Sequence, residues 1–229
     1  MDAENMTGVK EMLALISASV HDMKTPLTSI VGFADAILDG TVSEEKRAHY
    51  LRVIRDEAKR MSGLCEELLD ASRIESGTKK YEMKPFDICE SARRVIISLE
   101  KAIEKKRLDV SFEAEADSIT ALGDEKAINR VLYNICDNAV KFSYEGGCLC
   151  VSISYCGDMT TVRIRNDGKA MEEEELSQVF VPFYRKGEGR GTGLGMYIAK
   201  NIIDAHGGAI EAESKAGEGT AFSFRIFRG

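Results

Sequence analysis

Two long stretches of helical apolar periodicity near the start of the chain constrain the fold most. In the first, apolar residues follow one another at alternating steps of four and three, which is the heptad spacing of a helix that packs along one seam. These residues are Ile16, Val20, Met23, Leu27, Ile30, Ala34 and Ile37. Gly40 then stands where such a helix is expected to end.

A second helix is expected from about Glu44 to about Glu75, after a short turn in which Ser43 is the predicted N-cap. Its apolar residues fall near the same spacing: Tyr50, Ile54, Met61, Leu64, Leu68 and Ala71. Two long helices with a short connection form an antiparallel hairpin, but one hairpin has too little partner surface to bury such wide stripes. The sequence therefore predicts a homodimer in which two hairpins close a four-helix bundle.

The polar segment Ser76-Gly77-Thr78-Lys79-Lys80 is the predicted domain boundary, which gives a helical domain over 1–76 and a second domain over 77–229. Beyond it, helices are expected over 86–106, 124–142 and 194–206, and strands over 108–112, 148–155, 161–166, 209–214 and 221–227. The fold class is thus α+β and multidomain, with an N-terminal helical hairpin followed by an α/β sandwich.

Composition excludes several classes of function. The net charge of −7 argues against nucleic acid as the main partner. No run of about 18 apolar residues is present, so no membrane contact is expected within this segment. The six cysteines form no C-x-x-C pair and the chain has three histidines, so free thiols in a reducing cytoplasm are expected instead of a zinc site.

A glycine-rich segment precedes the last predicted helix. Gly191, Gly193 and Gly195 let backbone N–H groups approach an anion closely, and the helix N-terminus adds partial positive charge. This pattern fits a phosphate site, although a flexible loop that is rich in glycine by chance has the same letters.

The predicted helix over 124–142 has a polar face made of Asn134, Asn138 and Lys141, at steps of four and three. Two amides and an ammonium group can bind a metal-bound triphosphate: the amide oxygens are metal ligands, and the ammonium group pairs with the phosphates. A solvated polar face is the alternative, but asparagine is a poor helix former and two of them within a helix need a reason.

Two further positions carry candidate chemistry. Asn166 ends a predicted strand, where its side chain can reach the edge of a planar base, unless Asn166-Asp167-Gly168 is only a turn. His21 lies one residue after the seam position Val20, so it is expected to point outward. Asp22 can accept its Nδ1 proton and make Nε2 more nucleophilic, whereas an isolated surface histidine would be inert.

Together these stretches resemble the transmitter core of two-component sensor histidine kinases. "HDMKTPLTSIVGF" looks like the phosphoacceptor box and "NICDNAVKFS" like the asparagine box. "NDGKAM", "VFVPFYR" and "GRGTGLGMYIAKNIIDAHGGAIEAES" look like the first glycine box, the phenylalanine box and the second glycine box. The resemblance covers nearly the whole chain and implies a dimeric phosphotransfer hairpin followed by an ATP-binding domain of the gyrase, Hsp90 and histidine kinase type.

The resemblance implies a role for each matching residue. His21 would accept the phosphoryl group, Asp22 would be its base, and Thr25 would place water during dephosphorylation of a response regulator. Asn138 and Asn134 would hold Mg²⁺. The remaining ATP-binding positions would be Lys141, Asn166, Gly168, Gly191, Gly193, Leu194 and Gly195, with Lys186 and Arg190 as candidates for gripping the γ-phosphate.

One departure from the family pattern bears on the base. The family usually has Asp where this chain has Asn166. A neutral amide oxygen can still accept a hydrogen bond from adenine, but charge-assisted bonds are about twice as strong. The sequence therefore predicts weaker nucleotide binding or altered base selectivity.

The function expected from the resemblance is ATP-dependent autophosphorylation on His21 and transfer to an aspartate of a response regulator, with regulator phosphatase activity. A catalytically weak, nucleotide-gated docking module and a serine kinase on the same ATP-binding fold are the alternatives. The expected location is the cytoplasm, where the chain acts alone or as the cytosolic portion of a membrane-anchored sensor kinase.

Overall fold

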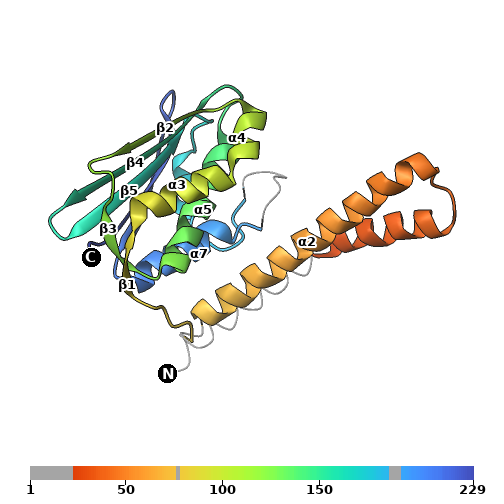
Figure 1. Cartoon of the computed structure of the whole chain (residues 1–229), viewed down its shortest axis with the longest axis horizontal. Coiled ribbons are helices and arrows are strands. Elements are labelled where there is room, and N and C mark those ends of the chain that lie inside the picture. Colours follow the sequence, from red (N-terminus) through yellow and green to blue (C-terminus); the bar gives the residue numbers. More distant parts are fainter. Residues whose placement is uncertain (1–22, 76–77, 186–191) are drawn as a thin grey trace. The chain divides into compact units, whose positions relative to one another are not determined.

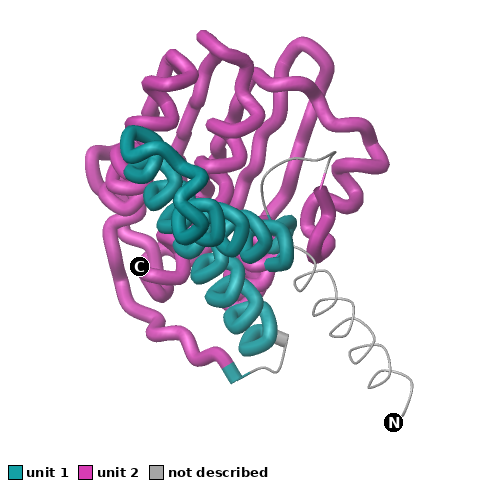
Figure 2. Tube along the Cα trace, turned by 90° about the vertical axis from the view of Figure 1, so that its right-hand side faces the viewer, with its two compact units in different colours: residues 1–78, 189–194 teal, residues 79–188, 195–229 magenta. Residues whose placement is uncertain are grey.

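The computed structural model describes residues 23–75, 78–185 and 192–229. The chain divides into two compact units, one formed by residues 1–78 with 189–194 and the other by residues 79–188 with 195–229 (Figure 2). Within the described residues, no helix combines the length and the apolar character needed to cross a membrane.

The first unit is a helical hairpin, as the sequence predicts. One helix covers residues 23–38, and Gly40 follows it with a left-handed backbone (φ +67°), the conformation that glycine adopts at helix ends. The second helix, α2, spans Glu44–Glu75. Ser43 precedes α2, and its carbonyl accepts hydrogen bonds from the backbone of Lys46 (2.9 Å) and Arg47 (3.2 Å).

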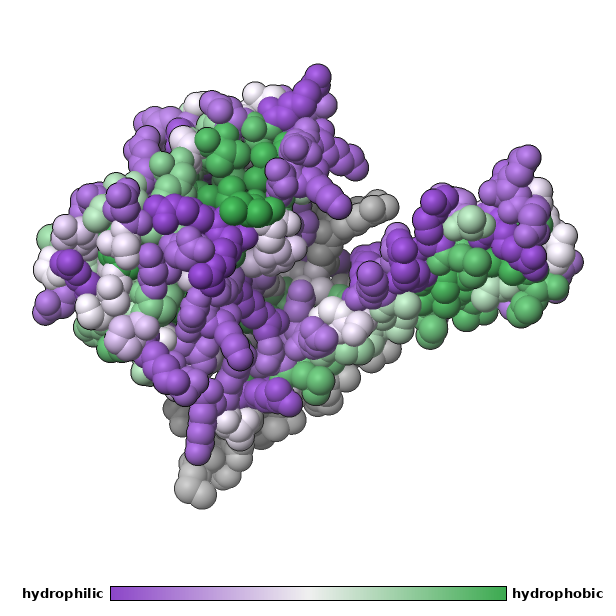
Figure 3. Space-filling model, viewed as in Figure 1, coloured by the Kyte–Doolittle hydropathy of each residue, from purple (hydrophilic) through white to green (hydrophobic). Residues whose placement is uncertain are grey.

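Apolar side chains remain uncovered on the hairpin of this single chain. Figure 3 shows them as a green region along the two helices. The exposed fractions are 49% for Leu27, 50% for Val31, 82% for Leu38, 54% for Leu51 and 57% for Leu69. Apolar side chains stabilise a structure only when they are removed from water, so stripes of this width call for a further apolar surface that covers them.

The second unit is an α/β sandwich. Its strands are β1 (Lys84–Asp87), β2 (Asp109–Ala114), β3 (Thr120–Gly123), β4 (Cys148–Cys156), β5 (Met159–Asn166), β6 (Ala209–Lys215) and β7 (Gly219–Phe227). Its helices are α3 (Ile88–Ser98), α4 (Glu100–Lys106), α5 (Glu125–Phe142), α6 (Glu173–Gln178) and α7 (Gly195–Ala205). The main sheet has the order β2-β4-β5-β7-β6, while β1 and β3 form a separate antiparallel pair. The predicted fold class, a hairpin followed by an α/β sandwich, is confirmed.

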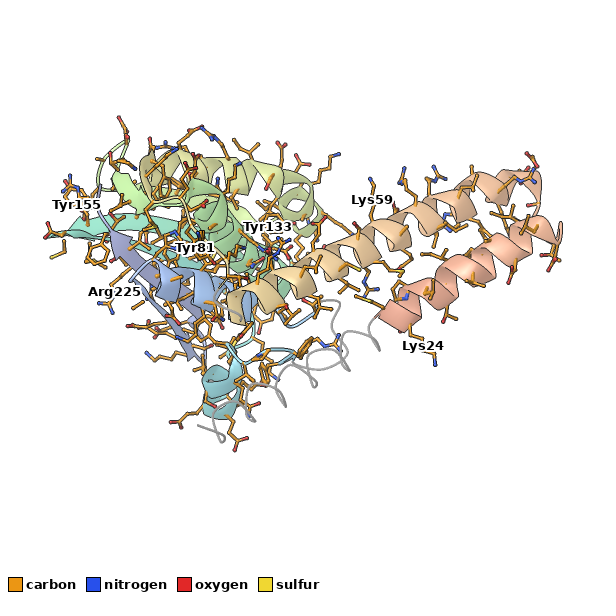
Figure 4. All side chains as sticks on the ribbon, turned by 90° about the horizontal axis from the view of Figure 1, so that it is seen from below. Lys24, Lys59, Tyr81, Tyr133, Tyr155 and Arg225 are labelled. Carbon is orange, nitrogen blue, oxygen red and sulfur yellow. The ribbon has the colours of Figure 1, made fainter. Side chains whose placement is uncertain are left out.

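The core lies between one face of the main sheet and helices α3, α5 and α7 (Figure 1). Successive strand residues point to opposite faces, so alternate residues of β4 and β5 are buried. The fully buried side chains include Leu149, Ile164, Phe224 and, from α5, Leu132 and Ile135. The opposite face is polar and carries cross-strand ion pairs, such as Arg225 (labelled in Figure 4) with Glu211 at 2.8 Å.

The prediction of one helix over 86–106 is wrong at its start and in its middle. Phe86 belongs to strand β1, where it pairs with Ala121 of β3. Asp87 is the N-cap of α3, because its carboxylate accepts from the backbone N–H groups of Cys89 (2.9 Å) and Glu90 (3.2 Å). The helix then breaks at Leu99. Strand β3 and the short helix α6 were not predicted from the sequence.

Asp124 joins three segments of the second unit. Its carboxylate caps α5 through the Ala127 N–H (3.1 Å) and also accepts from the Glu82 N–H (3.1 Å). Its own N–H donates to Nε2 of the buried His206, just beyond the end of α7 (3.0 Å). The other ring nitrogen, Nδ1, lies 2.7 Å from the Ile202 carbonyl. The entry segment, the start of α5 and the end of α7 therefore meet at one residue.

This junction predicts an acid-dependent contribution to stability. Burial alone would raise the pKa of Asp124, but backbone hydrogen bonds from Glu82, Ala127 and Lys126 and the nearby His206 hold it below its usual value of 3.8. A carboxyl group whose folded-state pKa is depressed stabilises the fold above its unfolded pKa. That contribution is lost as the pH falls below about 4.

We expect Asp124→Ala to lower the free energy of unfolding at pH 7 by about 1 kcal/mol through loss of the cap. Asp124→Asn keeps a capping oxygen without the charge, so its stability should depend less on pH between 5 and 3. Urea unfolding over this range measures both effects. An Asp124→Asn variant that loses stability as steeply as the parent protein in acid would contradict the assignment.

Candidate functional site

Helix α5 presents the polar face that the sequence predicts. Its apolar face, which includes Leu132 and Ile135, is buried, while Asn134 and Asn138 on the opposite side are half-buried. Tyr133 on the same side is 44% exposed (Figure 4). The 3.6-residue repeat of the helix produces this division, because residues three and four apart share a face.

Asn134 ties α5 to the first turn of α7. Its side-chain Nδ2 donates to the Gly195 carbonyl at 2.8 Å, and Gly195 is the first residue of α7. A Cβ atom on Gly195 would lie 3.4 Å from Asn134 Cγ, so the two residues are in close contact. The structure therefore brings these two predicted site residues together, with Oδ1 of Asn134 left for another partner.

Asn138 and Lys141 lie on the same side of α5 but differ in their partners. Within the described part of the chain, the Asn138 side chain has no hydrogen-bond partner. The Lys141 ammonium is 2.5 Å from the Asp137 carboxylate, four residues earlier on the helix. Sequence reasoning placed Lys141 on the phosphates and overlooked Asp137, although an acid four residues before a lysine is a recognisable helical ion-pair spacing.

Asn166 is buried at the end of β5, with only 3% of its surface exposed. In the orientation that satisfies both ends of its amide, Oδ1 accepts from the Gly168 N–H (3.0 Å) and Nδ2 donates to the Thr220 carbonyl (3.3 Å). The side chain thus joins its own turn to the start of β7. Thr220 is itself buried and was missed by sequence reasoning, although Gly219-Thr220 opens the last strand.

The turn after Asn166 requires a glycine for steric reasons. A Cβ atom on Gly168 would lie 1.8 Å from the Phe142 carbonyl oxygen at the end of α5. Only glycine allows such an approach of two backbone segments. Gly168 therefore sets the distance between the Asn166 turn and the end of α5, close in sequence to Lys141.

Of the glycine-rich segment, residues 192–195 are described. Gly193 has a left-handed backbone (φ +72°), which glycine adopts without strain. The backbone N–H of the buried Leu194 donates to the Thr192 hydroxyl at 3.1 Å. Gly191 and the two predicted lid cations, Lys186 and Arg190, lie outside the described residues.

Thr25 lies on the hairpin helix over residues 23–38 and is exposed. It lines an open depression together with Lys24, Thr28 and Ser29, and the Thr28 hydroxyl donates to the Lys24 carbonyl at 2.8 Å. Thr25 is thus accessible for chemistry on the helix surface. The predicted phosphoacceptor His21 and its neighbour Asp22 lie outside the described residues.

The donor set on α5 fits a magnesium ion. Mg²⁺ is bound by oxygen ligands and keeps several waters, so few protein oxygens are needed. The amide nitrogen of Asn134 donates to the Gly195 carbonyl, and among the described residues its amide oxygen accepts no hydrogen bond. With the unpartnered amide of Asn138 one turn further along, α5 offers two oxygens for one ion.

Comparison with known protein families finds two matches in chain order. Residues 11–77 match the His Kinase A (phospho-acceptor) domain. Residues 123–228 match the histidine kinase-, DNA gyrase B- and HSP90-like ATPase domain. The two matched regions coincide with the hairpin and with most of the sandwich described above.

Individual proteins show the same similarity. The chain is 30% identical to the circadian input-output histidine kinase CikA of Synechococcus elongatus over 94% of its length, which is 29% of CikA. It is 28% identical to the sensor histidine kinase YcbM of Bacillus subtilis, covering 99% of this chain and 74% of YcbM. The chain thus corresponds to less than a third of CikA.

Solved structures agree with these matches. The catalytic domain of histidine kinase ThkA is 31% identical, with a TM-score of 0.60 over 64% of this chain and 96% of that domain. A crystal structure of ThkA in complex with the response regulator protein TrrA gives 27% identity and a TM-score of 0.76. That similarity covers 99% of this chain and 64% of the ThkA chain.

The contacts of Asn166 lead to a stability prediction. In Asn166→Asp, one carboxylate oxygen can still accept from Gly168, but the other faces the Thr220 carbonyl where a donor stood. We expect the free energy of unfolding to fall by about 1–3 kcal/mol, as for a buried acceptor left unsatisfied. Urea unfolding without nucleotide measures this effect. Gln178→Glu, at an exposed position of α6, controls for the added negative charge. Equal stability of Asn166→Asp and the parent would contradict these contacts.

Proposed function

Because this chain belongs to the sensor histidine kinase family, we propose that it transfers the γ-phosphoryl group of ATP to His21 and then to an aspartate of a response regulator. Two observations support the proposal. The chain matches both domains that this reaction needs, a phosphoacceptor domain and an ATPase domain. The contact between Asn134 and Gly195 joins helix α5, where the sequence predicts the metal ligands, to the glycine-rich segment, where it predicts the phosphate contacts. This contact is the observation that supports nucleotide binding.

We assign the nucleotide contacts as follows. Asn138 and Asn134 hold Mg²⁺, which offsets negative charge on the phosphates when it is bound. Lys141 exchanges its partner Asp137 for a phosphate oxygen, and Lys186 and Arg190 approach the γ-phosphate. Gly191, Gly193, Leu194 and Gly195 line the triphosphate, because backbone N–H groups there can donate to its oxygens. Asn166 and Gly168 lie beside the base.

In the transfer step, Nε2 of His21 attacks the γ-phosphorus in line with the leaving oxygen. Asp22 accepts a hydrogen bond from Nδ1–H, which stabilises the positive charge that develops on the ring, and then takes this proton to leave a neutral phosphohistidine. The protein contributes mainly by positioning and by electrostatic stabilisation, because phosphoryl transfer leaves little covalent chemistry for it to perform. The cationic side chains stabilise the charge on the transferring group.

The proposed partners are a second copy of the chain and a response regulator. The uncovered apolar stripe of the hairpin supports a homodimer in which two hairpins bury their stripes against each other. The solved complex of ThkA with TrrA supports a regulator that docks on the kinase. We further propose that Thr25 positions the water that dephosphorylates this regulator, and that the reactions take place in the cytoplasm, where ATP is available.

A second candidate function has specific support. The amide of Asn166 is satisfied within the chain and Lys141 is paired with Asp137, so two expected nucleotide contacts are already in use. A nucleotide-gated docking module with weak catalysis would tolerate this arrangement. Retained ATP binding without phosphohistidine would favour the docking module over the kinase.

The phosphoacceptor is tested with ATP labelled at the γ position in the presence of Mg²⁺. We expect the full chain to incorporate label that is lost in acid and kept in base, as a phosphoramidate is. His21→Gln should fold and bind ATP but incorporate no label, whereas His49→Gln, on the exposed surface of α2, should label normally. Normal labelling of His21→Gln would show that another residue is the acceptor.

Thr25 is tested separately from phosphorylation. Thr25→Ala should autophosphorylate as the parent does but should release phosphate from a phosphorylated regulator at least tenfold more slowly, a loss of about 1.4 kcal/mol of transition-state stabilisation. Thr28→Ala is the matched control, since this hydroxyl is bonded to the helix backbone. Equal losses of both activities in Thr25→Ala would refute a selective role for Thr25 in dephosphorylation.

A further inference from the structure

Two cysteines lie side by side on the polar face of the main sheet. Cys148 and Cys150 alternate along β4 with the buried Leu149, so their thiols project from the face opposite the helices. Both side chains are half-exposed and both thiols are free. In a strand, residues two apart share a face and have Cα atoms about 6.6 Å apart.

A guanidinium group lies against this thiol pair. Arg165 is directly opposite Cys150 in the β4–β5 register, and its Nη2 donates to the Cys150 sulfur at 3.6 Å. The Arg165 Nη1 is held by the Glu218 carbonyl at 3.3 Å, which fixes the side chain in place. A cationic neighbour is typical of cysteines that react with oxidants.

The two thiols have different surroundings. The hydrogen bond to Cys150 raises the pKa of Arg165, which is the sign of a guanidinium that interacts with sulfur. Burial raises the pKa of Cys148, the neighbouring Cys150 and Asp167 add to the rise, and Arg165 acts in the opposite direction. Cys150, which accepts the hydrogen bond from Arg165, is therefore the nucleophile of the pair, and Cys148 is the thiol that attacks it in the second step.

We infer that Cys148 and Cys150 form an oxidation-sensitive dithiol that responds to hydroperoxides. The Cys150 thiolate attacks hydrogen peroxide, an S–O bond forms, the O–O bond breaks, and hydroxide leaves. Cys148 gives its proton to that hydroxide and then attacks the sulfenic sulfur of Cys150. An S–S bond forms, the S–O bond breaks, and a second hydroxide leaves and takes up a proton. Two thiols and one peroxide thus become one disulfide and two waters.

The disulfide would act on the nucleotide site. In a regular strand the Cβ atoms of residues two apart are about as far apart as their Cα atoms, whereas a disulfide needs about 3.5–4.5 Å between Cβ atoms, so the bridge closes only if β4 bends locally at Leu149. The residue between the two cysteines, Leu149, is paired with Asn166, and Asp167 packs against Gly147 at the start of β4. Distortion here moves the Asn166 turn, so oxidation weakens ATP binding. This consequence rests on the proposed function.

The test treats the reduced chain, residues 1–229, with hydrogen peroxide and follows its mass. We expect a loss of two hydrogen masses, reversed by a dithiol reductant. Cys148→Ser and Cys150→Ser should each abolish this loss, and Arg165→Met should slow it at least tenfold. Cys156→Ser is the matched control, because this exposed thiol lies on the same strand and on the same tryptic peptide, between Lys141 and Arg163.

Nucleotide binding is measured on the same samples. Oxidation should raise the Kd for ATP at least threefold in the parent and in Cys156→Ser, but not in Cys150→Ser. If peroxide forms no bridge, or if Cys150→Ser still forms one, the dithiol assignment is overturned. A bridge that leaves the Kd unchanged overturns the coupling to the nucleotide site. Because the mass measurement needs no nucleotide, a failure of the proposed kinase reaction is recognised separately.

Discussion

The packing of α5 against α7 is the interaction on which the rest of the second unit depends. The buried faces of the two helices supply the stability, since each buried aliphatic side chain contributes about 1.5–3 kcal/mol. Two hydrogen bonds then fix how the helices are aligned: Asn134 to Gly195 near the start of α7, and Asp124 to His206 beyond its end. Each such bond adds only about 1 kcal/mol, so their main effect is on geometry.

This alignment assembles the candidate site from distant parts of the sequence. Asn134 and Gly195 are 61 residues apart, yet their hydrogen bond places an amide-bearing helix against the first turn of α7. The Asn166 turn is positioned by a steric constraint instead, because Gly168 packs against the Phe142 carbonyl. A polar contact thus positions α7 against α5, and a close backbone approach positions the Asn166 turn against the end of α5.

Strand β5 contributes functional side chains to both faces of the sheet. Asn166 points toward the helices and the candidate nucleotide site, while Arg165, one residue earlier, points toward the thiols on the other face. The two-residue repeat of a strand makes this possible without any additional element. It also means that a chemical change on the polar face lies one residue from the nucleotide turn.

The sequence alone determined the features that depend on local periodicity and on short motifs. The hairpin helices, the glycine end at Gly40, helix α5 and the order of the two domains followed from spacing and from the family resemblance. The resemblance also supplied the roles of His21, Asp22, Lys186, Arg190 and Gly191, which lie outside the described residues and remain predictions.

Tertiary structure decided what depends on distant partners. Phe86 joined a strand because Ala121 pairs with it, although its local sequence suits a helix. Asn166 found its partner Thr220 across the sheet, and Cys150 lies beside Arg165 because of the strand register. The physical reason is that periodicity reports which face of an element is buried, whereas the partner on that face is set by how elements pack, which no short stretch of sequence encodes.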